Sequence, residues 1–272
     1  MSLRPEAVPS GLREVSVERE QLGAVERASD YVAEERPVAL HYYRLPYVVM
    51  LASPADLEDL GVGFTLSEGI VDAAAEIRGV ELARDGDAFA VHLTITGERL
   101  SRILQRQRNL TGRTGCGLCG VESVEEAVRH PTPVREGVNV TKAELHAELA
   151  RLHTLQPLNL QTGSVHAAAW ALPGKGIQLV REDVGRHNAL DKVIGALVRA
   201  GTDPRQGYLI ITSRASSEMV QKAATVGISL VVAVSAPTAL AIDLAVETGV
   251  TLIGFARADR HVVYAHAQRL RN

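Results

Sequence analysis

Leu230-Val-Val-Ala-Val234 lies between two similar apolar runs, Tyr208-Leu-Ile-Ile-Thr212 and Thr251-Leu-Ile-Gly-Phe255. Each run is continuously apolar, which is typical of a strand buried on both faces of a parallel sheet. Segments with helical spacing of apolar residues, 216–226 and 238–248, separate the three runs. This alternation predicts a parallel sheet that is covered by helices.

The alternation extends toward the middle of the chain. We predict a strand over Ile177–Val180 and a helix over His187–Ala200, and Thr141-Lys-Ala-Glu144 is a capping box that opens an earlier helix. The second half, residues 138–272, is therefore predicted to be a three-layer α/β/α domain.

Residues 1–137 are predicted to form a smaller N-terminal α/β domain. Its first dozen residues are expected to be a loose tail. Ser53-Pro54-Ala-Asp56 predicts a helix start with Ser53 as the cap, and a second helix is expected over Gly97–Leu110 with Arg99 on its surface. The expected strands are Val38–His41, Tyr47–Leu51, Ile77–Leu82 and Phe89–Ile95.

Composition narrows the class of protein. Hydrophobic residues make up 46% of the 272 residues, which is enough for a substantial core. The net charge of −3, without blocks of like charge, argues against bulk attraction to nucleic acid or to a membrane surface. The sequence shows neither a signal-peptide pattern nor a transmembrane stretch, so we expect a cytoplasmic protein with reduced thiols.

Both cysteines lie in one Cys-x-x-Cys motif, Arg113-Thr-Gly-Cys116-Gly-Leu-Cys119-Gly120. Such a motif serves as half of a zinc site, as a disulfide redox pair, or as a nucleophilic thiol with a neighbour. Tetrahedral zinc takes four ligands, so zinc would require a second copy of the chain or histidines such as His130. The flanking glycines favour a mobile arm, and a thiolate on such an arm suits sulfur or disulfide exchange with a partner protein.

A dense polar string joins a predicted strand to a predicted helix: Arg181-Glu-Asp183-Val-Gly-Arg186-His187-Asn-Ala-Leu-Asp-Lys192. Open α/β sheets bind ligands at this edge, so we predict a binding or catalytic role, with surface salt bridges as the alternative. Upstream, Thr162-Gly-Ser-Val-His166 predicts a turn that places His166 at the start of a small-residue helix. A packed histidine in that helix is the alternative interpretation.

Three further strand-to-helix junctions carry matching chemistry. If the strands are parallel, these junctions meet at one edge, where helix N-termini bind phosphate and arginines donate to pyrophosphate. Ordinary helix capping by Ser and Thr is the alternative at each single junction. Together they predict an anionic ligand with several phosphates, although the chain has no Walker-type loop and no clear Rossmann fingerprint. The junctions are Ser213-Arg214-Ala-Ser216, Ser235-Ala-Pro237-Thr238 and Phe255-Ala256-Arg257-Ala258-Asp259-Arg260.

These motifs resemble, in the same order, the formate dehydrogenase accessory sulfurtransferase family (FdhD). The resemblance covers roughly residues 36–264, and its most specific part is the Arg181–Lys192 string. One departure is Tyr42-Tyr-Arg-Leu-Pro46, where the family often has an Asn-Gly turn. The matching segments are Asp56–Leu60, Gly63–Gly69, Cys116–Gly120, Thr162–His166, Arg181–Lys192, Ser216–Lys222 and Ser235–Thr238.

The resemblance implies a sulfur carrier that active formate dehydrogenase requires. Such a carrier accepts persulfide sulfur from a cysteine desulfurase and passes it to Mo-bis(molybdopterin guanine dinucleotide), which it binds as a substrate without a permanent metal of its own. Cys116 would carry the persulfide and Cys119 would assist. The Phe255–Arg260 turn would lie in the cofactor site, and a homodimer is expected.

Other expected cofactor contacts follow from combining the resemblance with the basic junctions. Asp183, Arg186, His187 and Lys192 would orient or neutralise the cofactor, with further contacts from His166, Arg181, Arg214, Ser216, Ser235 and Thr238.

The resemblance also implies a C-terminal fold similar to cytidine deaminases. Zinc deaminases need His-x-Glu and a later Pro-Cys-x-x-Cys, whereas here Ala168 stands two residues after His166 and no cysteine follows it, so we expect no deaminase chemistry. Two alternatives to a sulfurtransferase stay open: a non-enzymatic chaperone that binds the cofactor, and a zinc-bridged structural dimer.

Overall fold

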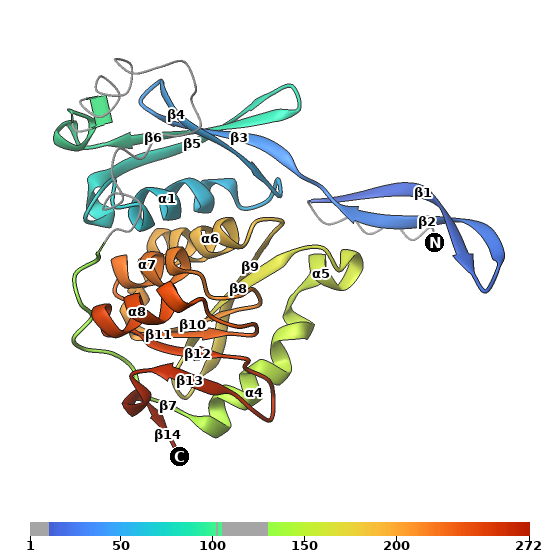
Figure 1. Ribbon diagram of the computed structural model, residues 1–272. Coiled ribbons are helices and arrows are strands. Elements are labelled where there is room, and N and C mark those ends of the chain that lie inside the picture. The colour runs from blue at the N-terminus through green and yellow to red at the C-terminus, as the bar shows by residue number, and fades with distance from the viewer. Residues whose placement is uncertain (1–10, 102, 105–129) are drawn as a thin grey trace, which may run out of the picture.

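The computed structural model describes residues 11–101, 103–104 and 130–272 (Figure 1). The elements stack in layers. A small sheet from the first half lies on helix α1 (Leu57–Ser67), and α1 lies on the helices of the second half. These helices cover a larger sheet, which carries α4 (Lys142–Leu152) on its other face. The prediction of an α/β protein with a larger C-terminal part is confirmed.

The larger sheet has the strand order β13-β12-β11-β10-β8-β9. The three apolar runs form its parallel centre, as predicted, and every residue of these three strands is buried. Strands β8 and β13 run antiparallel to their neighbours, so the sheet is mixed. The strands are β8 (His166–Leu172), β9 (Gly176–Asp183), β10 (Tyr208–Ile211), β11 (Leu230–Ala233), β12 (Thr251–Gly254) and β13 (Val262–Ala265).

Helices cover both faces of this sheet, which confirms the three-layer prediction. Helices α6 (Arg186–Arg199), α7 (Ser217–Thr225) and α8 (Ala239–Thr248) pack on one face, and α4 (Lys142–Leu152) packs on the other. The predicted capping box opens α4, since the Glu144 amide donates to Thr141 Oγ1 at 3.2 Å. The remaining short elements are α5 (Pro157–Thr162), β7 (Val140–Thr141), β14 (Leu270–Arg271) and the 3₁₀ turns Ala74–Glu76, His153–Leu155, Pro204–Gln206 and Ala267–Arg269.

The prediction that His166 begins a helix is wrong. His166 begins strand β8 and pairs with Asp183 of β9, and residues 167–171 are buried inside the sheet. Alanine has the highest helix propensity, but propensity is a small energy that strand pairing on both sides and burial of Trp170 override. Strand β13, which forms the edge of the larger sheet opposite β9, was not predicted.

The smaller sheet has the order β4-β3-β6-β5, and its inner face packs on α1 (Leu57–Ser67). Its strands match the four predicted ones: β3 (Arg36–Tyr42), β4 (Leu45–Ala52), β5 (Ile77–Asp85) and β6 (Ala88–Ile95). The β3–β4 hairpin forms without an Asn-Gly turn. Tyr43 adopts φ +53° there, and its hydroxyl donates to the carbonyl of Ile95 at 2.7 Å.

A long hairpin, β1 (Leu12–Gln21) and β2 (Ala24–Ala33), projects from the body of the molecule (Figure 1). It was not predicted, and Leu12 of the expected loose tail begins its first strand. Leu12 packs with Leu158 and Val165, which fixes the base of the hairpin on the second half of the chain. The rest of that tail, residues 1–10, lies outside the described residues.

Helices α1 and α6 cross at two glycines. A Cβ atom on Gly63 would overlap the Asp191 carbonyl oxygen, and one on Gly195 would overlap the Asp59 carbonyl oxygen. The two backbones therefore touch, and one hydrophobic cluster runs through both halves of the chain. The proposed boundary between residues 137 and 138 stays a prediction, as does the likeness to cytidine deaminases.

Two predictions about the first half need correction. Asp56, not Ser53, is the N-cap residue of α1, and the buried Ser53 bonds to residues of the second half instead. Arg99 lies in the helix at residues 97–101 and is buried, because it pairs with Glu76 and Asp72. None of the helices in the described part of the chain has the length and apolar character that a membrane crossing requires.

Candidate functional site

The polar junctions meet at one edge of the larger sheet, as predicted. Strand register aligns the end of β9 with the start of β8, and it aligns the ends of β10, β11 and β12 with one another. The start of β13 pairs with Gly254 at the same edge. Helices α6, α7 and α8 begin here, so their N-terminal N–H groups face the same side. We call this surface the strand-end edge.

The strand-end edge carries positive charge without matching carboxylates. Its arginines are Arg186, Arg214, Arg257 and Arg260. No carboxylate of the described residues forms an ion pair with any of these four. Two buried polar atoms at this edge, Arg186 Nε and Ser216 Oγ, have no hydrogen-bond partner among the described residues. Such atoms are costly unless a ligand or water satisfies them, which favours a site for an anion.

Two histidines lie beside Arg186. His187 Nε2 is 2.6 Å from Glu218 Oε2, and this contact lowers the pKa of the Glu218 carboxyl. Burial lowers the pKa of His166, and the charges of Arg186 and His187 lower it further. Burial and these charges therefore favour the neutral form of His166. The start of β8 thus offers a neutral imidazole next to a cationic group, which suits hydrogen bonding to a phosphate oxygen or a heterocycle.

The turn after β12 forms a hollow of about 250 Å³ lined by Phe255, Arg257, Arg260, His261 and Val262. Phe255 adopts φ +48°, which is unusual for a bulky residue, and its ring is exposed. The Arg257 amide donates to the Arg260 carbonyl at 2.7 Å and closes the turn.

Residues 258 and 259 of this turn are exposed. Ala256 is fully buried in the core below the turn, and its predicted contact with a ligand stays a prediction.

The Ser and Thr residues of the junctions differ in what they do. The Thr238 hydroxyl accepts from the Ala241 amide at 3.3 Å, so it caps α8, the ordinary alternative. Ser216 stands at the N-cap of α7, but its side chain makes no capping bond. Ser235 is exposed at the end of β11. Ser216 and Ser235 are therefore available to a ligand, whereas Thr238 is occupied.

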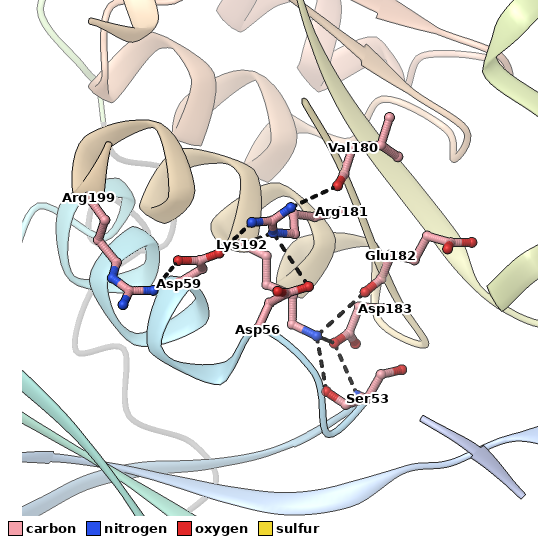
Figure 2. A network of polar contacts seen from close by, with 9 residues as sticks. All are labelled: Ser53, Asp56, Asp59, Val180, Arg181, Glu182, Asp183, Lys192 and Arg199. Atoms are coloured by element: carbon pink, nitrogen blue, oxygen red, sulfur yellow. Dashed lines mark hydrogen bonds and ion pairs between the residues drawn. The ribbon is translucent and has the colours of Figure 1, made fainter. Parts of the chain in front are cut away.

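Asp183 and Lys192 lie below the edge, inside the protein, and neither side chain is exposed. Lys192 Nζ is 2.6 Å from Asp183 Oδ2 and donates to the Ser53 carbonyl at 3.0 Å (Figure 2). The Ser53 amide donates to Asp183 Oδ2, and Ser53 Oγ accepts from the Val184 amide. The prediction that they contact the cofactor directly needs correction: they fix the β9–α6 junction against the first half of the chain.

Arg181 is also used internally. Its guanidinium donates to Asp59 Oδ2 at 2.9 Å and lies 3.4 Å from Asp56 Oδ2, while Arg199 binds the other Asp59 oxygen at 2.5 Å (Figure 2). Asp59 thus accepts from two arginines of the second half. The polar string is therefore divided. Arg186 and His187 lie at the strand-end edge, whereas its other charged residues bond inside the protein to α1, to Ser53 just before α1, or to the start of α5.

Comparisons with known proteins show the family of the chain. The FdhD/NarQ family model matches residues 33–271. The chain is 49% identical over 257 residues to the "Sulfur carrier protein FdhD" of Cupriavidus necator, covering 94% of this chain and 89% of that protein. It is also 49% identical over 269 residues to the protein of that name from Xanthomonas axonopodis pv. citri, covering 99% and 94%.

This chain belongs to the FdhD/NarQ family. A solved structure shares the fold: a putative formate dehydrogenase accessory protein from Desulfotalea psychrophila, with a TM-score of 0.75 and 24% identity. That comparison covers 95% of this chain and 99% of the other. The fold and the strand-end edge described above are thus those of an FdhD/NarQ protein.

The motif that drew attention in the sequence, Cys116 and Cys119, lies outside the described residues. Its role in this FdhD/NarQ protein stays a prediction.

Sequence reasoning missed the residues that join the halves. Ser67 Oγ donates to Asp191 Oδ1 at 2.6 Å, and Lys222 Nζ is 2.9 Å from Asp191 Oδ2, all three side chains being buried. Charged residues inside the apolar stripes of α6 and α7 were the available signal, because a charge is buried only with a partner. His261, which lines the hollow, was missed because it follows the predicted turn.

Proposed function

We propose that this FdhD/NarQ protein is a sulfur carrier for formate dehydrogenase. It would take sulfur from a cysteine desulfurase as a persulfide on Cys116 and pass it to Mo-bis(molybdopterin guanine dinucleotide). The observation that supports the proposal is the strand-end edge, where arginines without carboxylate partners accompany the buried, unpartnered Arg186 Nε and Ser216 Oγ. The relatives named sulfur carrier proteins support the sulfur chemistry.

The edge suits the anionic parts of such a cofactor. Each guanine dinucleotide carries a pyrophosphate, and guanidinium groups bind phosphate oxygens through paired N–H donors. The hollow of about 250 Å³ beside Phe255 is smaller than a usual drug-sized pocket. It would therefore hold one group of the cofactor, and the rest would extend along the edge toward Arg186 and Ser216.

The sulfur steps balance with thiols alone. The Cys116 thiolate attacks the terminal sulfur of the desulfurase persulfide, an S–S bond forms at Cys116, and the desulfurase thiolate leaves. The Cys119 thiolate then attacks Cys116 Sγ and expels the sulfur as hydrosulfide toward the cofactor. The two thiols supply both electrons and become a disulfide, which an external thiol reduces.

Mass spectrometry after incubation with a cysteine desulfurase and cysteine tests the carrier role. We expect one added sulfur on the peptide that contains Cys116, and we expect dithiothreitol to remove it. Cys116→Ala should abolish loading, whereas Cys119→Ala should still load and should release sulfur slowly. An unmodified Cys116 under these conditions would refute the proposal.

Two further outcomes would support one of the alternative functions instead. If Cys116→Ala still supports maturation of formate dehydrogenase, the protein is a chaperone that binds the cofactor. If stoichiometric zinc accompanies the purified protein and chelation unfolds it, the cysteines are structural. Light scattering of the same samples tests the expected homodimer.

A further inference from the structure

A pair of histidines connects the hollow at the strand-end edge to the opposite face of the sheet. His261 lines the hollow together with Arg257 and Arg260. Its Nδ1 is 2.9 Å from Nε2 of His146, which belongs to α4, and the two ring centroids are 5.1 Å apart. Both side chains are partly buried. One imidazole must therefore donate an N–H to the other, and the direction of that bond fixes the tautomer of each ring.

The direction matters for an anion. If His146 Nε2–H donates to His261 Nδ1, His261 carries its own proton on Nε2, on the side of the ring away from His146. It then presents a donor, as Arg257 and Arg260 do. In the reverse arrangement His261 would present a lone pair, which repels a phosphate oxygen.

We propose that His146 is a positioning residue that holds His261 in the Nε2–H tautomer, so that His261 donates to a phosphate oxygen in the hollow. This inference rests on the proposed function, since it assigns the hollow to a phosphate group of the cofactor. It adds a role for a helix on the far face of the sheet, which no junction motif indicates.

The surrounding groups favour the neutral form of His261 when no ligand is bound. His146 and Lys142 face His261 from α4, and Arg257 and Arg260 face the same hollow from the turn, which also contains Asp259. Burial lowers the pKa of His261, and His146 and Lys142 lower it further. A bound anion reverses this preference, so affinity for a phosphate ligand should rise as the pH falls below neutrality.

Three variants of the full-length protein distinguish a positioning role of His146 from a purely structural one. His146→Leu removes the hydrogen bond and keeps the volume, whereas His146→Gln keeps an N–H donor in place. His153→Leu, an exposed histidine just after α4, is the control. Calorimetry with GDP and with pyrophosphate gives the affinities, and ¹⁵N spectra of the imidazoles give the tautomer of His261.

We expect the Nε2–H tautomer at His261 in the wild type and a mixture of tautomers in His146→Leu. GDP affinity should fall about tenfold in His146→Leu and stay within about twofold of wild type in His146→Gln and His153→Leu. Pyrophosphate should follow GDP if the phosphates occupy the hollow. If His146→Leu weakens GDP binding but leaves pyrophosphate binding unchanged, the phosphate assignment is wrong.

The failures of the two proposals are distinguishable. Wild-type binding of GDP, with the tautomer and the affinity unchanged in His146→Leu, would overturn this inference and leave the proposed function in place. Absence of binding of either ligand to the wild type would overturn this inference together with the cofactor assignment, while sulfur loading of Cys116 tests the carrier role separately.

Discussion

The strand-end edge and the contact between α1 and α6 use similar side chains in opposite ways. At the contact with α1 and the preceding Ser53, Arg181 and Lys192 are each matched with carboxylates, and Lys192 and Asp183 are fully buried (Figure 2). At the edge, Arg186 and Arg214 have no carboxylate partner among the described residues, and Arg186 Nε lacks any hydrogen-bond partner there. In the contact region every one of these charges has a partner inside the protein, whereas at the strand-end edge the cations lack oppositely charged partners among the described residues until a ligand binds.

The difference shows how the short Arg181–Lys192 string supplies both buried ion pairs and surface cations. Strand β9 ends at Asp183 and α6 begins at Arg186, so a few residues turn from the interior to the surface. Desolvation offsets most of the attraction within the buried pair, so we expect the pair to fix orientation more than to add net stability. It holds the N-terminus of α6, with Arg186 and His187, at a fixed place on the edge.

The largest effect should come from breaking the buried pair. Lys192→Met leaves the Asp183 carboxylate inside the protein without its cation, so we expect the free energy of unfolding to fall by about 3–5 kcal/mol. Urea denaturation followed by circular dichroism measures it. Arg214→Met, at the edge, is the matched control and should change stability by less than about 0.5 kcal/mol. Equal losses of unfolding free energy in the two variants would contradict the distinction between the buried contact and the strand-end edge.

The next largest effect should come from the backbone contact between α1 and α6. Gly195→Ala places a methyl group against the Asp59 carbonyl oxygen, so α1 and α6 must separate. We expect a loss of about 2–3 kcal/mol in unfolding free energy. Gly97→Ala is the control, because open space surrounds a Cβ there. A neutral Gly195→Ala would show that the helix contact is loose.

At the edge, binding should change and stability should not. Arg186→Gln removes a donor that lacks a carboxylate partner, and we expect GDP affinity to fall about tenfold with an unchanged urea midpoint. Arg271→Gln, on exposed β14, should leave the affinity unchanged. If Arg186→Gln mainly unfolds the protein, Arg186 belongs with the structural charges instead.

The smallest effect tests a third cluster, Arg99 with Glu76 and Asp72. The hydrogen bond from Arg99 lowers the pKa of Glu76 to about 2. A lowered carboxyl pKa gives stability that is complete above the ordinary value and is lost as the pH falls toward 2. Glu76→Gln should therefore be less stable than wild type at pH 7, with a difference that shrinks on acidification.

Urea midpoints at several pH values measure that difference, with the exposed Glu81→Gln as the control. A difference between wild type and Glu76→Gln that does not depend on pH would contradict the assignment of the shift to the Arg99 contact.

Much of the fold could be predicted because its signals are local. The runs that became β10, β11 and β12 are fully buried as expected, and Thr141 caps α4 through a residue three positions away. The errors have nonlocal causes. His166 lies in a strand because β9 and β10 pair on both sides of β8, and Ser53 leaves its predicted cap to bind Asp183, 130 residues away.

The same limit applies to the candidate site. Parallel strands imply that their following junctions meet, so the sequence by itself determined that Arg214, Ser216 and the Phe255–Arg260 turn share an edge. Which charges of the Arg181–Lys192 string face solvent was decided only by the tertiary structure, since it depends on whether a segment distant in the sequence supplies a partner. The periodicity of apolar residues is a local property of the sequence. The partner of a charged side chain is set only when distant segments pack together and exclude water.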